Sequence, residues 1–147
     1  MLLKIKKFFV QNQRLAKREF KSKMIKNSIA RKSKFLKHNL FINNSETSLK
    51  IQWLKNSQQV CDYLSTANEL DYKNCYLISC QYSFNTIDFQ IPMDIAIVDL
   101  NWNVIQIYKS LLPNKNIDFK KVGHVFVFAK NSLDVLEITE GCQLRPM

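Results

Sequence analysis

The sequence predicts a mainly β domain, a compact β-sandwich or barrel-like fold with one short helix, preceded by a long basic N-terminal helix. Three observations lead to this expectation. Residues 1–37 contain no Gly or Pro and are rich in helix-forming residues. Several short apolar segments follow, separated by polar turn residues. Hydrophobic residues make up 46% of the 147 residues, which is ordinary for a globular chain.

The charge distribution divides the chain into a basic helical arm, residues 1–40, and a β-rich globular domain, residues 41–147. The arm holds thirteen Lys or Arg residues and one acidic residue, a net charge of +12, whereas the remainder has a net charge of −2. Ala16, Phe20 and Met24 recur at intervals of four, so the expected helix has only a narrow apolar stripe. Such a helix gains little by packing on its own domain.

A basic helix of this kind suits a polyanion, and we expect the arm to dock on RNA or on a ribosome-like particle, where Lys and Arg neutralise phosphates and release counterions. The predicted nucleic-acid-binding residues are Lys4, Lys6, Lys7, Arg14, Lys17, Arg18, Lys21, Lys23, Lys26, Arg31, Lys32 and Lys34. Three other interpretations stay open: a mitochondrial-type transit peptide, adsorption on an anionic membrane surface, and a solvated tail without a dedicated partner. We expect a cytoplasmic location, or the mitochondrial matrix if the arm includes a transit peptide.

The globular domain begins with a strand over residues 49–53, where apolar and polar residues alternate. Ser57 is a suitable N-cap for a helix that runs to about Leu70. A compact apolar strand follows over residues 75–80.

The clearest buried strand lies in residues 91–100, where Ile and Met alternate with small or acidic residues. Pro92 cannot donate to a sheet ladder and therefore belongs at the start of this strand or at an edge. Residues 101–103 suit a hairpin turn because Asn tolerates positive φ, and Asp99 is expected to cap that turn through its side chain. The return strand leads to Tyr108.

Beyond this hairpin we expect a polar loop over residues 109–121 and a buried strand over residues 122–128. A last strand is expected over residues 133–138, and residues 142–147 read as a tail. His124 lies in an apolar strand, where a histidine is more often a satisfied core residue than a catalyst.

A further observation concerns a motif around the central strand. Ser83, Phe84, Asn85 and Thr86 open it, Pro92, Asp94 and Asp99 close it, and Leu112-Pro113, Leu136-Glu137 and Gly141 follow. With these residues the chain resembles, over residues 76–141, the bacterial domain-of-unknown-function family 192. Asn85 replaces the family's usual His, the Gly of its hairpin turn is absent, and its further Gly-Asp-containing strand would lie beyond Met147. The resemblance implies a small β-sandwich-like fold of unsettled biochemical role.

We find no catalytic constellation, and we expect non-enzymatic binding. Asp94 and Asp99 are five residues apart in one strand, so they face opposite sides and cannot act as a carboxylate pair. Asn85 and Thr86 are candidates to line a pocket beside Asp94, although the amide of Asn85 does not titrate near neutral pH. The alternative function is a soluble small-molecule-binding or enzymatic domain whose arm is a targeting segment or tail.

The cysteine pattern indicates neither a metal site nor a cofactor. Cys61, Cys75, Cys80 and Cys142 lack CxxC pairing and a companion His, so reduced thiols are expected. No stretch approaches the roughly 20 apolar residues that a membrane-spanning helix requires.

Overall fold

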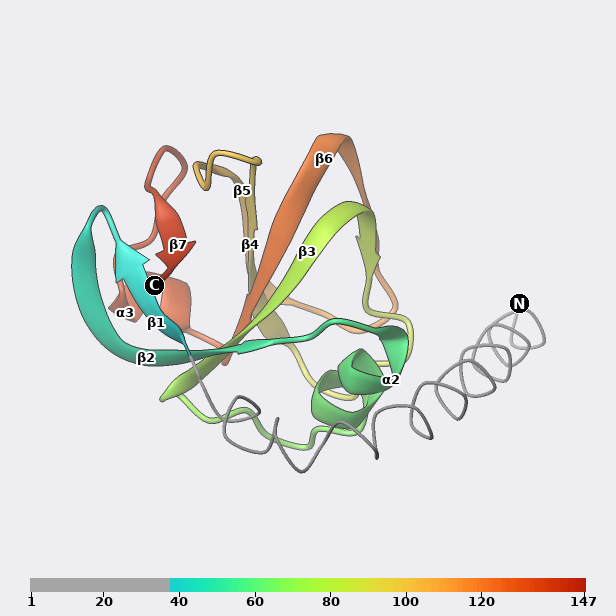
Figure 1. Cartoon of the computed structure of the whole chain (residues 1–147). Coiled ribbons are helices and arrows are strands. Elements are labelled where there is room, and N and C mark those ends of the chain that lie inside the picture. Colours follow the sequence, from blue (N-terminus) through green and yellow to red (C-terminus); the bar gives the residue numbers. More distant parts are fainter. Residues whose placement is uncertain (1–37) are drawn as a thin grey trace, which may run out of the picture.

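The fold comes from a computed structural model that describes residues 38–147 (Figure 1). In chain order the elements are β1 (His38–Ile42), β2 (Ser45–Trp53), α2 (Ser57–Val60), the π-helical turn η2 (Cys61–Ser65), β3 (Asn74–Asn85), β4 (Met93–Val98), β5 (Val104–Leu111), β6 (Asn116–Phe128), α3 (Ser132–Val135) and β7 (Leu144–Pro146). The prediction of a mainly β domain is confirmed. The predicted basic helix lies outside the described residues.

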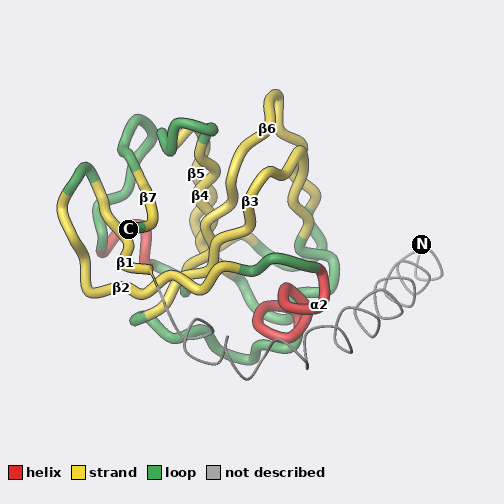
Figure 2. The backbone as a smooth tube through the Cα atoms, in the orientation of Figure 1, coloured by secondary structure: helices red, strands yellow, loops and turns green. Residues whose placement is uncertain are grey.

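The seven strands within residues 38–147 form one sheet in the order β5-β4-β6-β3-β2-β1-β7. Only β2 and β3 run parallel, and their connection contains α2 and η2, because a parallel pair needs a crossover. The two ends of the sheet meet near the start of β5. There Val104 N donates to the Cys142 carbonyl at 2.7 Å, and Leu144 N donates to the Trp102 carbonyl at 2.9 Å. One sheet therefore curls toward a barrel instead of dividing into two packed sheets (Figure 2).

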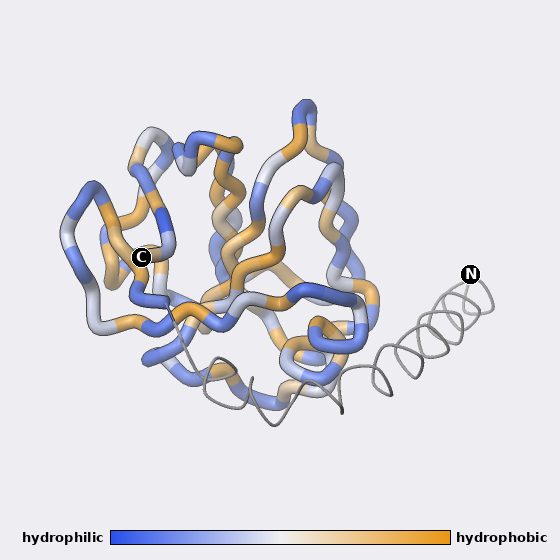
Figure 3. Tube along the Cα trace, in the orientation of Figure 1, coloured by the Kyte–Doolittle hydropathy of each residue, from blue (hydrophilic) through white to orange (hydrophobic). Residues whose placement is uncertain are grey.

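Strand β4, which lies between β5 and β6, is buried along its whole length because apolar clusters cover both of its faces. Ala96 and Val98 belong to one cluster, together with Phe126 of β6. Ile97 belongs to the other cluster, which Leu64 of η2 helps to cover. A strand buried on both faces reads as a nearly continuous apolar run, as this segment does. Figure 3 shows hydrophobic residues concentrated on the central strands and hydrophilic residues at the outer turns.

The β4–β5 hairpin confirms the predicted turn and its cap. The Asp99 carboxylate accepts hydrogen bonds from Asn101 N and Asn103 N, both at 2.9 Å. The residue that takes the left-handed conformation is Trp102, at φ 69°, and not Asn101 or Asn103 as the tolerance of Asn for positive φ suggested. Pro92 immediately precedes β4, as its missing N–H group requires.

The helix predicted from Ser57 to Leu70 is wrong in length. The α-helical part ends at Val60, and a π-helical turn continues only to Ser65. The N-cap is Asn56, whose side chain accepts from the backbone N–H of residue 59 at 2.9 Å.

The predictions for the C-terminal part also need correction. The expected loop over residues 109–121 is short, because β5 extends to Leu111 and β6 begins at Asn116. The strand expected over residues 133–138 is wrong: the short helix α3, Ser132–Val135, occupies its first half and directly follows Asn131, which is left-handed at φ 71°. The expected tail contains β7, which pairs with β1.

The boundary between arm and domain lies earlier than residue 41. β1 starts at His38 and is hydrogen-bonded to β2 on one side and β7 on the other. Leu40 has 0% exposure and belongs to the core. Residues 38–40 are therefore part of the folded domain, although their composition placed them with the arm.

Candidate functional site

Thr86, one of the predicted pocket residues, is 1% exposed. Its hydroxyl donates to the Leu112 carbonyl at 2.8 Å and accepts from Lys115 N at 3.0 Å. Its own backbone N–H donates to the Lys115 carbonyl at 2.8 Å. Thr86 therefore connects the end of β3 to the loop between β5 and β6. Its hydroxyl is used both as a hydrogen-bond donor and as an acceptor.

Asp94 is also 1% exposed, and both of its carboxylate oxygens accept backbone hydrogen bonds. One accepts from Ser110 N at 2.8 Å, and the other accepts from Leu133 N at 3.0 Å. Ser110 lies in the left-handed region at φ 51°, which a residue with a side chain adopts at a cost. Leu133 is in the first turn of α3, where N–H groups lack partners within the helix. Asp94 thus fixes the bend of β5 and the start of α3.

Asn85 is exposed at the end of β3, where it pairs with Asn116. Of the three predicted pocket residues, it alone presents its side chain to solvent. Thr86 and Asp94 instead form hydrogen bonds with the backbone near the end of β5. Thr86 bonds to residue 112, and Asp94 bonds to residue 110. Their arrangement supports a structural role, because their polar atoms already have partners.

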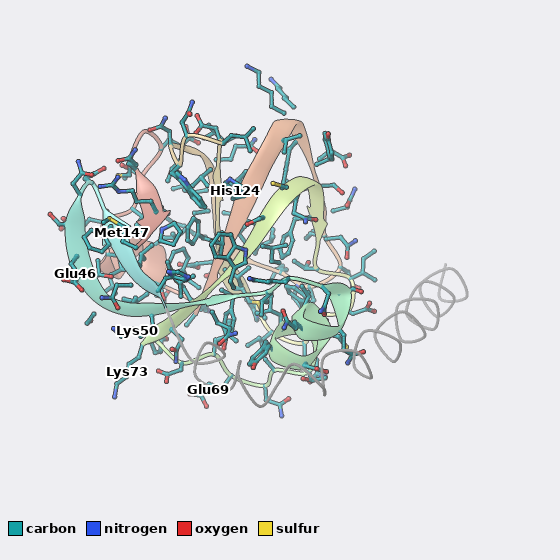
Figure 4. The ribbon with its side chains drawn as sticks, viewed as in Figure 1. Glu46, Lys50, Glu69, Lys73, His124 and Met147 are labelled. Carbon is teal, nitrogen blue, oxygen red and sulfur yellow. The ribbon has the colours of Figure 1, made fainter. Side chains whose placement is uncertain are left out.

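A second candidate site lies around His124 of β6, which Figure 4 labels. Its neighbours come from distant parts of the sequence, so sequence reasoning did not bring them together. His124 is 7% exposed, and the Nδ1 of its ring accepts from Cys80 N at 3.1 Å, which places the proton on Nε2 in the neutral form. Trp102 stacks on it with ring centroids 4.3 Å apart and planes 19° apart. Burial lowers the pKa of His124, and the negative charge of Asp99 opposes that change in part. The prediction that His124 is buried in the apolar strand is confirmed, and its Nδ1 has a backbone partner.

The thiols differ in their surroundings. All four cysteines are free. Burial raises the pKa of Cys75 far above its ordinary value. The hydroxyl of Thr139 lies 3.5 Å from the Cys142 sulfur, and this hydrogen bond lowers the pKa of that thiol. Across residues 38–147, no three His, Cys, Asp or Glu side chains are grouped to hold a metal ion.

The twelve predicted nucleic-acid-binding cations, from Lys4 to Lys34, lie outside the described residues. In the described part, the one surface ion pair joins Lys109 to Asp134 at 2.6 Å, with both side chains more than half exposed. No helix between residues 38 and 147 is both long and apolar enough to cross a membrane.

Comparison with known proteins gives similarity of fold alone. No family model and no curated protein matches the sequence. A proposed transcription regulator from Sinorhizobium meliloti 1021 aligns with a TM-score of 0.64 at 12% identity, covering 75% of this chain and 93% of the other. A protein of unknown function from Novosphingobium aromaticivorans DSM 12444 aligns with a TM-score of 0.63 at 16% identity, covering 73% of this chain and 83% of the other. The described domain is therefore similar in fold to these two bacterial proteins.

Proposed function

We propose that this is a non-enzymatic binding protein whose basic N-terminal arm docks on RNA, within or on a ribosome-like particle. The observation that carries the proposal is the segregation of charge: residues 1–40 have a net charge of +12, and the remainder has a net charge of −2. A cationic segment of this density attracts polyanions and gains affinity by releasing their counterions. The domain would then act as the folded platform to which the arm is attached.

The polar residues of the domain support this proposal over a catalytic one. The buried carboxylate of Asp94 and the buried hydroxyl of Thr86 are occupied by backbone groups. The imidazole of His124 accepts a backbone hydrogen bond and lies under an indole ring. A general acid or base needs a polar atom that can reach a substrate, whereas the carboxylate of Asp94, the hydroxyl of Thr86 and Nδ1 of His124 are engaged by backbone groups.

Binding of a labelled RNA by the full chain, measured by fluorescence anisotropy against salt concentration, tests the proposal. If six arm cations contact phosphates, the log–log salt slope is about −4, so the Kd rises roughly 300-fold between about 50 and 200 mM salt. A chain that begins at Lys37 removes the arm and retains β1 with its buried Leu40, and it should lose this binding. A start at residue 44 would delete β1 and confuse loss of the arm with unfolding.

A full-length variant with six lysines changed to glutamine is the matched control for the truncation, because it keeps the arm's length. Suitable positions are Lys4, Lys6, Lys7, Lys17, Lys21 and Lys23. This variant should bind weakly and with a shallow salt slope. Absence of RNA binding by the unaltered chain at about 100 mM salt would refute the proposal. Binding of the unaltered chain to anionic vesicles instead would favour the membrane interpretation of the arm.

We also propose that the domain is a divergent member of the bacterial domain-of-unknown-function family 192. The motif residues between Ser83 and Asp99 support this proposal, and the observed mainly β fold agrees with it. A profile built from close homologues of this chain tests it. A profile that retains Thr86, Pro92 and Asp94 and aligns with the family over residues 76–141 is the expected result.

A further inference from the structure

β6 forms a large bulge opposite Tyr82 of β3. The register pairs on either side of the bulge are Gln81↔Gly123 and Ser83↔Asp118. Tyr82 alone therefore faces residues 119–122, and this excess length must arch away from the sheet. Figure 3 shows that β6 projects as a hydrophilic tip beyond the neighbouring strands. We refer to Tyr82 and residues 119–122 as the β3–β6 tip.

The tip combines an exposed aromatic ring with free cations. Tyr82 is 72% exposed, compared with 59% for Tyr72 and 43% for Tyr63. Lys120 and Lys121 are both exposed on the facing segment. Among residues 38–147, no carboxylate forms an ion pair with either lysine, and no other ring stacks on Tyr82. The side chains of Tyr82, Lys120 and Lys121 are therefore available to a partner, whereas Phe119 packs against the core.

We propose that the β3–β6 tip contacts single-stranded RNA. An unpaired base stacks on the face of Tyr82, and Lys120 and Lys121 attract the phosphates beside it. This inference rests on the proposed function, because the arm brings the RNA to the protein. It adds a selectivity that the arm lacks. Phosphates are present in single and double strands alike, whereas stacking on a tyrosine requires a base that is free of its own partner.

Tyr72, the next most exposed tyrosine of the described residues, lies in less favourable surroundings for RNA. Tyr72 follows Asp71 directly, and Glu69 lies in the same segment, so carboxylates would repel phosphates there. Figure 4 shows Glu69 and Lys73 at the end of the molecule opposite the tip. Tyr72 and Lys73 are therefore suitable positions for control substitutions of the same residue types.

The test compares a labelled single-stranded RNA of about 20 nucleotides with an RNA duplex of about the same length, using full-length protein and fluorescence anisotropy. Tyr82→Ala should raise the Kd for the single strand about fivefold or more and leave the Kd for the duplex within about twofold. Replacing Lys120 and Lys121 by glutamine should make the salt slope on the single strand shallower by about 1.4. Tyr72→Ala and Lys73→Gln should change neither quantity.

The outcomes separate this inference from the proposed function. If the unaltered chain binds the single strand and Tyr82→Ala binds it equally well, the arm acts alone and the tip inference is overturned. If Tyr82→Ala weakens the single strand and the duplex equally, stacking on an unpaired base is refuted. If the unaltered chain binds neither RNA, the proposed function fails and the tip inference fails with it. Equal thermal unfolding of Tyr82→Ala and the unaltered chain establishes that any loss reflects contact.

Discussion

Asp94→Asn nearly preserves the size of a side chain that is 1% exposed while removing its charge and one acceptor. The amide oxygen can still accept from Ser110 N or from Leu133 N, but the NH2 group then faces the other backbone donor. Losing one charge-assisted hydrogen bond and leaving a buried N–H without an acceptor costs about 2–4 kcal/mol in the free energy of unfolding. For a chain of 147 residues, that corresponds to a decrease in Tm of roughly 6–13 °C.

Urea and thermal denaturation followed by circular dichroism measure this loss. Asp94→Ala removes both acceptors and should destabilise the domain more than Asp94→Asn does. Asp88→Asn in the preceding exposed loop is the matched control and should remain within about 0.5 kcal/mol of the unaltered chain. If Asp94→Asn is as stable as this control, the carboxylate does not hold β5 and α3 together. Asp94 would then have to be reconsidered as a pocket residue.

Gly123→Ala should cost about 1–3 kcal/mol in urea denaturation, because the added methyl would lie 2.6 Å from a backbone carbonyl of β4; an unchanged midpoint would contradict the close approach of β4 and β6. Burial lowers the pKa of His124, so the native state binds fewer protons than the unfolded state. The Tm should therefore fall as the pH drops below about 6.5, and His124→Gln, which keeps an acceptor for Cys80 N, should flatten this dependence; an equally steep profile in that variant would assign the effect to other groups. Alkylation mapped by mass spectrometry should spare Cys75, whose pKa burial raises, and should modify Cys142 at lower pH than an ordinary thiol, because a hydroxyl hydrogen bond lowers its pKa; rapid modification of Cys75 in the native protein would show that its strand opens.

The parts of the fold that the sequence predicts well are those set by neighbours in the chain. The β4–β5 hairpin depends on an alternating apolar pattern and on Asp99, which bonds to backbone groups two and four residues away. Contacts between residues this close in the chain can be predicted from the sequence alone. The arm–domain boundary was misplaced because His38, Asn39 and Leu40 resemble the preceding residues in composition, whereas their place in the sheet depends on distant strands.

The candidate site could not be read in the same way because its contacts join distant segments. Asp94 bonds to backbone groups 16 and 39 residues away, and His124 bonds to one 44 residues away. No spacing rule relates these positions. The C-terminal residues were misassigned for a related reason: the strand character of residues 144–146 comes from pairing with β1, about a hundred residues earlier in the chain.

The hydrogen bonds of the buried polar residues to the backbone also limit which groups can bind a partner. A buried polar residue that satisfies backbone donors contributes to stability, and its substitution should alter unfolding before it alters recognition. Under the proposed function, recognition would depend on the cations of the arm and on the exposed ring of Tyr82. The arm supplies charge and should control the salt dependence of binding, whereas the ring of Tyr82 should control the ratio of single-strand to duplex affinity. Because these two quantities arise from different interactions, an arm variant should change the first without the second, and Tyr82→Ala should do the reverse. A variant of either kind that changed both quantities together would indicate that arm and tip form one continuous binding surface.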